Sequence, residues 1–286
     1  TQNVWKQKFI DHTKEILDSL AYQQKIDLVN EFAKPVSAEA LKIITGLTNM
    51  TWQEMDRVSQ GMIDGCANYS QNKKVEENCH NCTASIDFHI RDRLEQDLGS
   101  DPSLLSVFKA KNVTFETISA NVKLAISGGQ NEPRDAIAGT IATLLQNPNQ
   151  LEKIFNGEFD WLKAFEEYAR WMSPIGMSPR RIAKDFLYKD FNFFENDRVF
   201  LMFGSANRDE EIFENAEKFK LDRNLARAIS FGAGPHFCAG AWISKTLIAE
   251  VAIPMLFEKF PNIKLLSGVE YFGWAFRGPK PFFVKL

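Results

Sequence analysis

A single cysteine near the C-terminus lies in the part of this sequence best suited to hold a metal. Residues 231–240 read Phe-Gly-Ala-Gly-Pro-His-Phe-Cys-Ala-Gly, and an apolar stretch with helical character follows from Ala239 to Phe257. Glycine allows the backbone to turn through positive φ and to approach a flat ligand closely. A thiolate that immediately precedes a helix is stabilised by the helix dipole. We therefore expect Cys238 to be a sulfur ligand to a metal in an apolar pocket; the alternative is an ordinary buried thiol.

An unusual segment interrupts the long apolar stretch from Thr114 to Leu145. Residues 127–135 read Ser-Gly-Gly-Gln-Asn-Glu-Pro-Arg-Asp, and in a helix interior each glycine costs about 1 kcal/mol and a proline about 3 kcal/mol relative to alanine. Proline also clashes with the carbonyl one turn earlier, so we expect a kink that opens room for dioxygen and water beside a metal. There Glu132 can exchange protons and Asn131 can donate or accept a hydrogen bond. The alternative is a kinked core helix without a chemical role.

A charged pair further along the chain is expected to have a structural role. Glu167 and Arg170 are three residues apart in Glu-Tyr-Ala-Arg, so on a helix they lie on one face and are close enough to pair. A bidentate arginine–carboxylate network is well suited to hold a loop that aims a metal ligand. The alternative is an exposed ion pair, which would contribute little to stability.

The composition is that of a globular protein. The chain has 286 residues, of which 44% are hydrophobic and 25% charged, with a formal net charge of −3. This balance indicates neither nucleic acid nor an anionic membrane as a partner, and there is no apolar run long enough for a transmembrane helix. The N-terminal residues lack the pattern of a secretory signal, and four cysteines indicate a reducing compartment. We therefore expect a cytoplasmic protein.

Two of these cysteines form a Cys-x-x-Cys pattern at Cys79 and Cys82. A structural zinc site would need a second pair of ligands at matching spacing, and none follows. We therefore expect surface cysteines on a polar, solvated helix.

The elements that must position these residues are mainly helical. Apolar periodicity predicts helices over residues 4–20, 38–47 and 52–63, and residues 73–98 read as a solvent-facing helix or helix pair. Patches typical of strands are fewer and cover residues 199–203, 263–266 and 282–286. Because no repeat or linker divides the chain, we expect residues 1–286 to form a single mainly α domain with small β-sheets.

The cysteine segment resembles the haem-ligand loop of the cytochromes P-450, in which a cysteine thiolate holds the iron. Residues 167–170 resemble the Glu-x-x-Arg helix of that family, and Ala-Asn-Arg-Asp at 206–209 resembles a bacterial motif in it. The resemblance implies a cytochrome P-450 fold that binds haem b, with Arg223 as the third partner of Glu167 and Arg170. It implies these cofactor-binding residues: Cys238, His236, Arg181, Phe231, Gly232 and Gly240. Soluble members are longer than this chain, so the resemblance also implies that an N-terminal portion is lacking.

The resemblance further implies a haem-thiolate monooxygenase that uses dioxygen and externally supplied electrons. Most members carry an acid followed by threonine where this chain has Asn131 and Glu132, so the usual threonine relay is in doubt and these two residues become the catalytic candidates. The Glu-Pro variant and residues 270–279 resemble a branch that removes methyl groups from small methoxy compounds. The resemblance thus favours oxidative O-demethylation of a methylated sugar such as 6-O-methyl-D-galactose, ahead of a guaiacol-type aromatic, with release of formaldehyde. The implied partners are a ferredoxin and an NAD(P)H-dependent ferredoxin reductase. The alternative is a haem protein without turnover, either a gas sensor or a degenerate paralogue.

Overall fold

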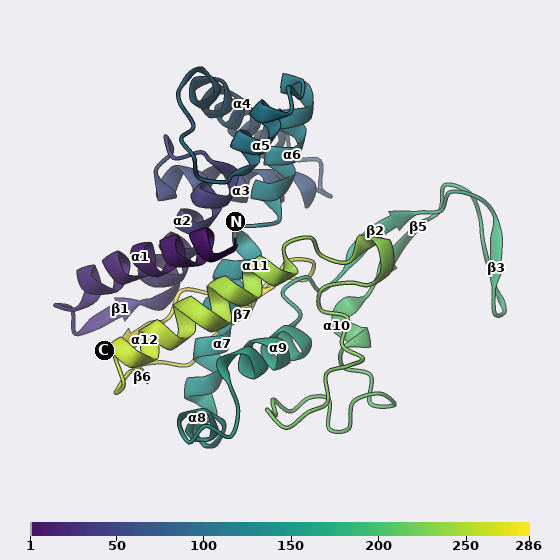
Figure 1. Ribbon diagram of the computed structural model, residues 1–286. Coiled ribbons are helices and arrows are strands. Elements are labelled where there is room, and N and C mark those ends of the chain that lie inside the picture. Colours follow the sequence, from purple (N-terminus) through teal and green to yellow (C-terminus); the bar gives the residue numbers. More distant parts are fainter. Residues whose placement is uncertain (1) are drawn as a thin grey trace.

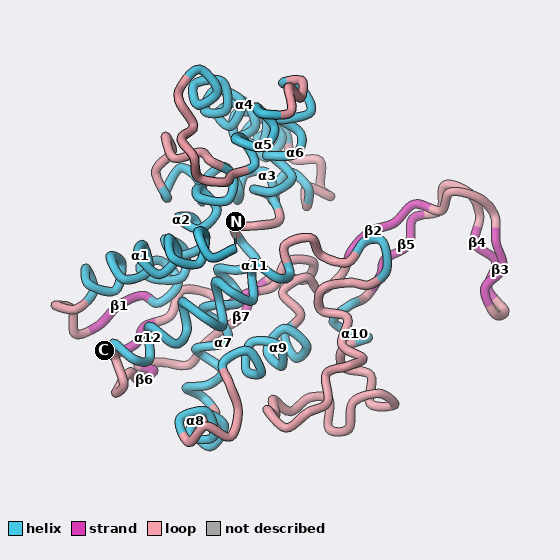
Figure 2. Tube along the Cα trace, in the orientation of Figure 1, coloured by secondary structure: helices cyan, strands magenta, loops and turns pink. Residues whose placement is uncertain are grey.

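The computed structural model describes residues 2–286 and is mainly helical with small sheets, which confirms the predicted fold class (Figures 1 and 2). The first half contains α1 (Gln2–Leu20), the π-helical turn η1 (Leu28–Ala33), α2 (Lys34–Thr45), α3 (Trp52–Cys66), α4 (Lys73–Glu95), α5 (Leu104–Ala110), α6 (Phe115–Ser127) and α7 (Asn131–Gln146). The second half contains α8 (Pro148–Phe155), α9 (Trp161–Met172), α10 (Phe203–Ala206), the 3-10 turn η2 (Gly234–His236), α11 (Ala241–Lys245), the π-helical segment η3 (Thr246–Ala252) and α12 (Ile253–Lys259). No helix within these described residues has both the length and the apolar character needed to cross a membrane.

All the sheets are small and antiparallel. One sheet has the order β1 (Lys25–Asp27), β9 (Phe283–Lys285), β6 (Lys264–Leu265), so that the beginning and the end of the chain meet in it. The paired strands of the remaining sheets are β2 (Ser178–Arg181) with β5 (Arg198–Leu201), β3 (Phe186–Tyr188) with β4 (Phe191–Phe193), and β7 (Tyr271–Phe272) with β8 (Gly278–Pro279). The predictions at 199–203, 263–266 and 282–286 are confirmed, whereas the other strands were not expected from the sequence pattern.

The helices form two packed groups. In Figure 1, α3, α4, α5 and α6 lie together at the top, while α7, α9 and the C-terminal helices lie below them. The upper group encloses an apolar cluster that includes Val58, Ile86 and Val122, and the lower group encloses a larger one around Ile137 and Ile141 of α7. The ribbon formed by β2 and β5 and the hairpin formed by β3 and β4 extend away from both groups.

The helix α4 is not the wholly solvated element that the sequence predicts. Its Cys82, Ile86 and Ile90 side chains are buried. The Cys82 sulfur occupies the space that a side chain at Gly61 of α3 would need. A glycine in the facing helix therefore makes room for the thiol. The expectation that Cys82 lies at the surface is wrong.

The predicted interruption between Thr114 and Leu145 is confirmed, and it falls at residues 128–130. Pro133 lies in the first turn of α7, where its missing N–H is not needed for the helix, so the expectation that its ring kinks a continuous helix is wrong. The carbonyl groups near the break are satisfied by side chains of the neighbouring helices. Ser59 donates to the oxygen of Ile126 at 3.1 Å, and Ser37 donates to the oxygen of Gln130 at 2.7 Å. The break is thus held in place by α2 and α3.

A side-chain cap fixes the start of α9. The Asp160 carboxylate accepts a hydrogen bond of 2.8 Å from the Lys163 backbone N–H, which satisfies one of the free donors of the first turn. The position at which the helix starts determines the direction in which Glu167 and Arg170 point. Both side chains are fully buried.

Candidate active site

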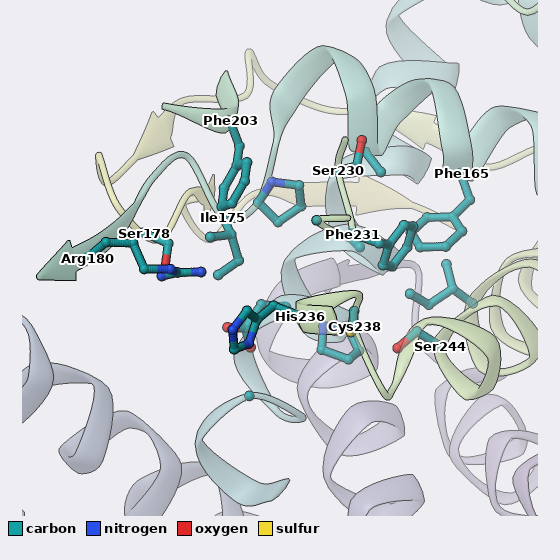
Figure 3. Close-up of a pocket in the computed structure, with 18 residues that line it drawn as sticks. Phe165, Ile175, Ser178, Arg180, Phe203, Ser230, Phe231, His236, Cys238 and Ser244 are labelled. Carbon is teal, nitrogen blue, oxygen red and sulfur yellow. The ribbon is translucent and has the colours of Figure 1, made fainter. Parts of the chain in front are cut away.

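A largely apolar cavity of about 320 Å³ lies between α7, α9 and the cysteine segment (Figure 3). Its helical walls come from α7, α9, α10, α11 and η3, and the loop at 230–238 and strand β2 also contribute. Its lining residues include the aromatic Phe165 and Phe231 and the polar or ionisable Glu132, Arg180, His236 and Cys238. In Figure 3, Arg180 and Ser178 lie on one side of the cavity, and Phe231 and Phe165 lie on the opposite side with Cys238 between them.

The cysteine loop is shaped by backbone hydrogen bonds and glycine. Gly232 and Gly234 have φ values of 72° and 62°, a conformation that strains residues with a Cβ. The Cys238 N–H donates to the carbonyl of Phe231 at 2.9 Å, which closes the loop. The thiol of Cys238 is exposed and lines the cavity. Gly240 stands beside it, since a Cβ at this position would lie 3.8 Å from the sulfur.

The structure brings Glu167, Arg170 and Arg223 together in a buried network. Arg170 donates to both carboxylate oxygens of Glu167 at 2.8 Å, and Arg223 Nε donates to Glu167 Oε1 at 3.1 Å. The remaining guanidinium donors of Arg170 and Arg223 reach backbone carbonyls between residues 207 and 218. Buried charges are tolerated when they are paired and fully hydrogen-bonded in this way. The three residues therefore fix the long segment that precedes the cysteine loop.

Asn207 connects that network to the cysteine loop, a role that the sequence pattern did not reveal. Its backbone carbonyl accepts from Arg170 Nη1 at 2.9 Å, while its side-chain oxygen accepts from the Ile229 N–H at 2.8 Å. Its amide nitrogen donates to the hydroxyl of Ser173 at 3.0 Å. Because Asn207 is fully buried, the position of residue 229 follows the position of the ion-pair network.

Glu132 lines the cavity, and one of its carboxyl oxygens has no hydrogen-bond partner among the described residues. This oxygen, Oε2, is buried. Burial raises the pKa of this carboxyl from 4.5 to about 7, because loss of water disfavours the charged form. A group with such a pKa can take up and release a proton near neutral pH.

Three predicted residues do not line the cavity: Gly240, which lies beside the Cys238 sulfur, Asn131 and Arg181. Asn131 is buried, and its amide faces α3, where Nδ2 donates to Gln60 Oε1 at 3.4 Å. Arg181 donates to the side-chain oxygen of Asn196, and its neighbour Arg180 lines the cavity instead. Successive residues of a strand point to opposite faces, so only one of the two arginines can face this space.

Comparison with known proteins gives the same fold and a family match. The family model described as "Cytochrome P450" matches residues 163–262. Cytochrome P450 107B1 of Saccharopolyspora erythraea is 27% identical over 270 residues, covering 92% of this chain and 65% of that protein. The polyketide biosynthesis cytochrome P450 PksS of Bacillus subtilis is 28% identical over 263 residues, covering 91% of this chain and 64% of that protein. The chain therefore spans somewhat less than two thirds of the length of these two relatives.

Solved structures resemble this chain over its whole length. P450BioI in complex with hexadec-9Z-enoic acid ligated acyl carrier protein has a TM-score of 0.89 at 23% identity, covering 100% of this chain and 75% of that chain. PksS of Bacillus subtilis has a TM-score of 0.85 at 25% identity, covering 100% of this chain and 76% of that chain.

Proposed function

We propose that this chain is a haem-thiolate monooxygenase of the cytochrome P450 family, in which Cys238 holds the iron of haem b. Members of the family bind haem b and are monooxygenases. The observation that carries the proposal is the exposed Cys238 thiol, which shares an apolar cavity with the unpartnered carboxyl of Glu132.

The residues around the cavity fit a haem. A flat apolar macrocycle needs apolar walls, and Phe231, Phe165 and Ala136 supply them. Carboxylates that leave water need hydrogen-bond donors, and the Arg180 guanidinium and His236 imidazole face the same space (Figure 3). We assign to Arg180, in this structure, the propionate contact that the resemblance gives to Arg181. When both variants are mixed with a protein that takes up free haem, Arg180→Ala should lose its haem faster than Arg181→Ala. Faster loss from Arg181→Ala would instead assign the propionate contact to Arg181.

The chain's own residues would bind the haem, exclude water and move protons. When bound, the haem supplies the activation of dioxygen, with the thiolate tuning the iron. Glu132 would deliver protons at its Oε2 atom and recover them from solvent. Asn131 would act only indirectly, because its side chain is hydrogen-bonded to Gln60 and Arg134 and does not line the cavity.

We propose a small methoxylated compound as the substrate, with a methylated sugar favoured over a guaiacol-type aromatic. Two electrons, two protons and dioxygen would convert the methyl group to a hydroxymethyl ether and water. The ether then breaks to the free alcohol and formaldehyde. The support is the resemblance carried by Glu132-Pro133 and residues 270–279. A ferredoxin and an NAD(P)H-dependent reductase would supply the electrons.

Formaldehyde release tests this function. The haem-loaded chain is supplied with ferredoxin, reductase and NADPH and is screened against methoxy sugars and methoxyphenols, with Cys238→Ser as the control. Formaldehyde in proportion to NADPH consumed, absent in the control, is the expected result. NADPH consumption at background with every methoxy compound would instead support a haem protein without turnover, which the missing threonine favours.

A further inference from the structure

A buried ion pair next to Glu132 on α7 does not line the cavity. Arg134 Nε donates to Asp135 Oδ1 at 2.8 Å, and Arg134 Nη2 donates to Asp135 Oδ2 at 3.1 Å. The two residues are only 5% and 4% exposed. A bidentate pair of this kind fixes both the position and the charge of the guanidinium.

The Arg134 side chain fastens the first turn of α7 to α3. Its Nη1 atom donates to Asn131 Oδ1 at 3.2 Å and lies 3.5 Å from Gln60 Oε1 and 3.7 Å from Asp56 Oδ1. Asp56 also accepts a hydrogen bond of 3.1 Å from Gln130 Nε2. A cation is well suited to this place, because it joins several acceptors from two helices at the break between α6 and α7.

The same cation presents an electrostatic problem for Glu132. A positive charge two residues away in a poorly solvated region favours the carboxylate form of a neighbouring acid. Burial is the main reason that the pKa of Glu132 is raised, Asp135 raises it further, and Arg134 opposes both. Arg134 and Asp135 on α7 are the charges that act on Glu132 directly. Asp56 on α3 and Lys34 at the start of α2 act on Asp135 in turn. Arg180, His236 and Cys238 line the same cavity as Glu132.

Asp135 is itself held firmly from the other side. A Cβ placed on Gly278 of β8 would lie 2.6 Å from each Asp135 oxygen, so the strand packs directly on the carboxylate. Asp135 therefore has little freedom to leave Arg134.

We propose that Asp135 is a positioning residue for Glu132. It holds the Arg134 guanidinium that fastens α7 to α3 and cancels its positive charge. Glu132 therefore lines the cavity without a neutralising cation and can hold a proton. This inference rests on the proposed function, in which Glu132 handles protons. It explains why an acid directly follows the arginine in the Glu-Pro-Arg-Asp sequence.

The test follows the protonation of Glu132 directly rather than turnover. Infrared spectra of the full chain, labelled with carbon-13 glutamate, are recorded across the neutral pH range, and the protonated Glu132 band is identified by its loss in Glu132→Gln. Asp135→Asn removes the bidentate partner of the cation, leaving only the more distant Asp56, and should lower the midpoint of this band by about one pH unit or more. Arg134→Gln leaves the anion uncompensated and should raise it. The double variant should return it toward the native midpoint.

The matched control is Asp64→Asn, which removes an exposed carboxylate on α3 that accepts a 2.8 Å hydrogen bond from Gln60. It should leave the midpoint unchanged. The proposal is overturned if either single variant shifts the midpoint in the opposite direction or not at all, or if the double variant does not compensate. Should Asp135→Asn fail to fold, Arg134→Gln and the double variant still decide the sign. Absence of formaldehyde from the native enzyme would contradict the proposed function but would leave this pattern of midpoints intact.

Discussion

The side-chain oxygen of Asn207 accepts a 2.8 Å hydrogen bond from the backbone N–H of Ile229, although the two residues are far apart in sequence. Through this bond the buried Glu167–Arg170 pair is connected to the segment that enters the cysteine loop. The loop is therefore positioned by the body of the protein rather than by its own sequence alone.

Replacing Asn207 with alanine should destabilise the protein and loosen the loop. The change leaves the Ile229 N–H and the Ser173 hydroxyl without their buried partner, which should cost about 2 to 4 kcal/mol of unfolding free energy. Urea unfolding measures the loss. The control is Asn192→Ala on the exposed surface of β4, which should change stability by about 0.5 kcal/mol or less. Equal stability of the two variants would contradict the role given to Asn207.

Replacing Cys238 with serine should remove the thiolate-type carbon monoxide spectrum of the reduced haem protein. Helix content measured by circular dichroism should stay the same, because the thiol is exposed and packs in no apolar cluster. Cys66→Ser, a change at another exposed cysteine, should leave the spectrum intact. A native spectrum in the Cys238 variant would rule out this residue as the iron ligand.

Replacing Glu132 with glutamine should make stability less dependent on pH. The native pKa of about 7 lies above the ordinary value of 4.5, so the folded state keeps its proton while the unfolded state has lost it. Native stability should therefore fall as pH rises from 4.5 to 7, by on the order of 3 kcal/mol in total. Unfolding free energies measured across this range should show a smaller fall in Glu132→Gln. Glu152→Gln, on the exposed face of α8, should retain the native slope.

Replacing Gly139 with alanine should disrupt the contact between α7 and α9. A Cβ on Gly139 would collide with the hydroxyl end of Tyr168, which is fully buried. Overpacking should cost about 2 kcal/mol or more, which exceeds the gain of roughly 1 kcal/mol from replacing glycine in a helix. Gly268→Ala has open space around its new methyl group and should be tolerated. Thermal unfolding of the two variants distinguishes them, and similar transitions would show that Tyr168 moves aside at little cost.

The sequence predicted the features that depend on local chemistry. The helices, the interruption near Gly128 and the glycine-shaped cysteine loop follow from periodicity, backbone freedom and residue spacing. The pairing of Glu167 with Arg170 likewise follows from their separation on one helix.

The features that depend on long-range packing could not be predicted in this way. Short strands such as β1 and β8 carry too few residues to show alternation, and they exist because another strand pairs with them. The choice between Arg180 and Arg181 depends on the register of β2 with β5, which no local pattern specifies. The burial of Cys82 likewise depends on a glycine in another helix.

The close packing of Gly278 on Asp135 links what two distant positions can accept in evolution or in engineering. As long as residue 135 carries a carboxylate, residue 278 has no space for a side chain, so even an alanine there must displace the acid or the strand. Substitution at either position is therefore an epistatic event: variants at 278 would become viable only in backgrounds where residue 135 has already become smaller.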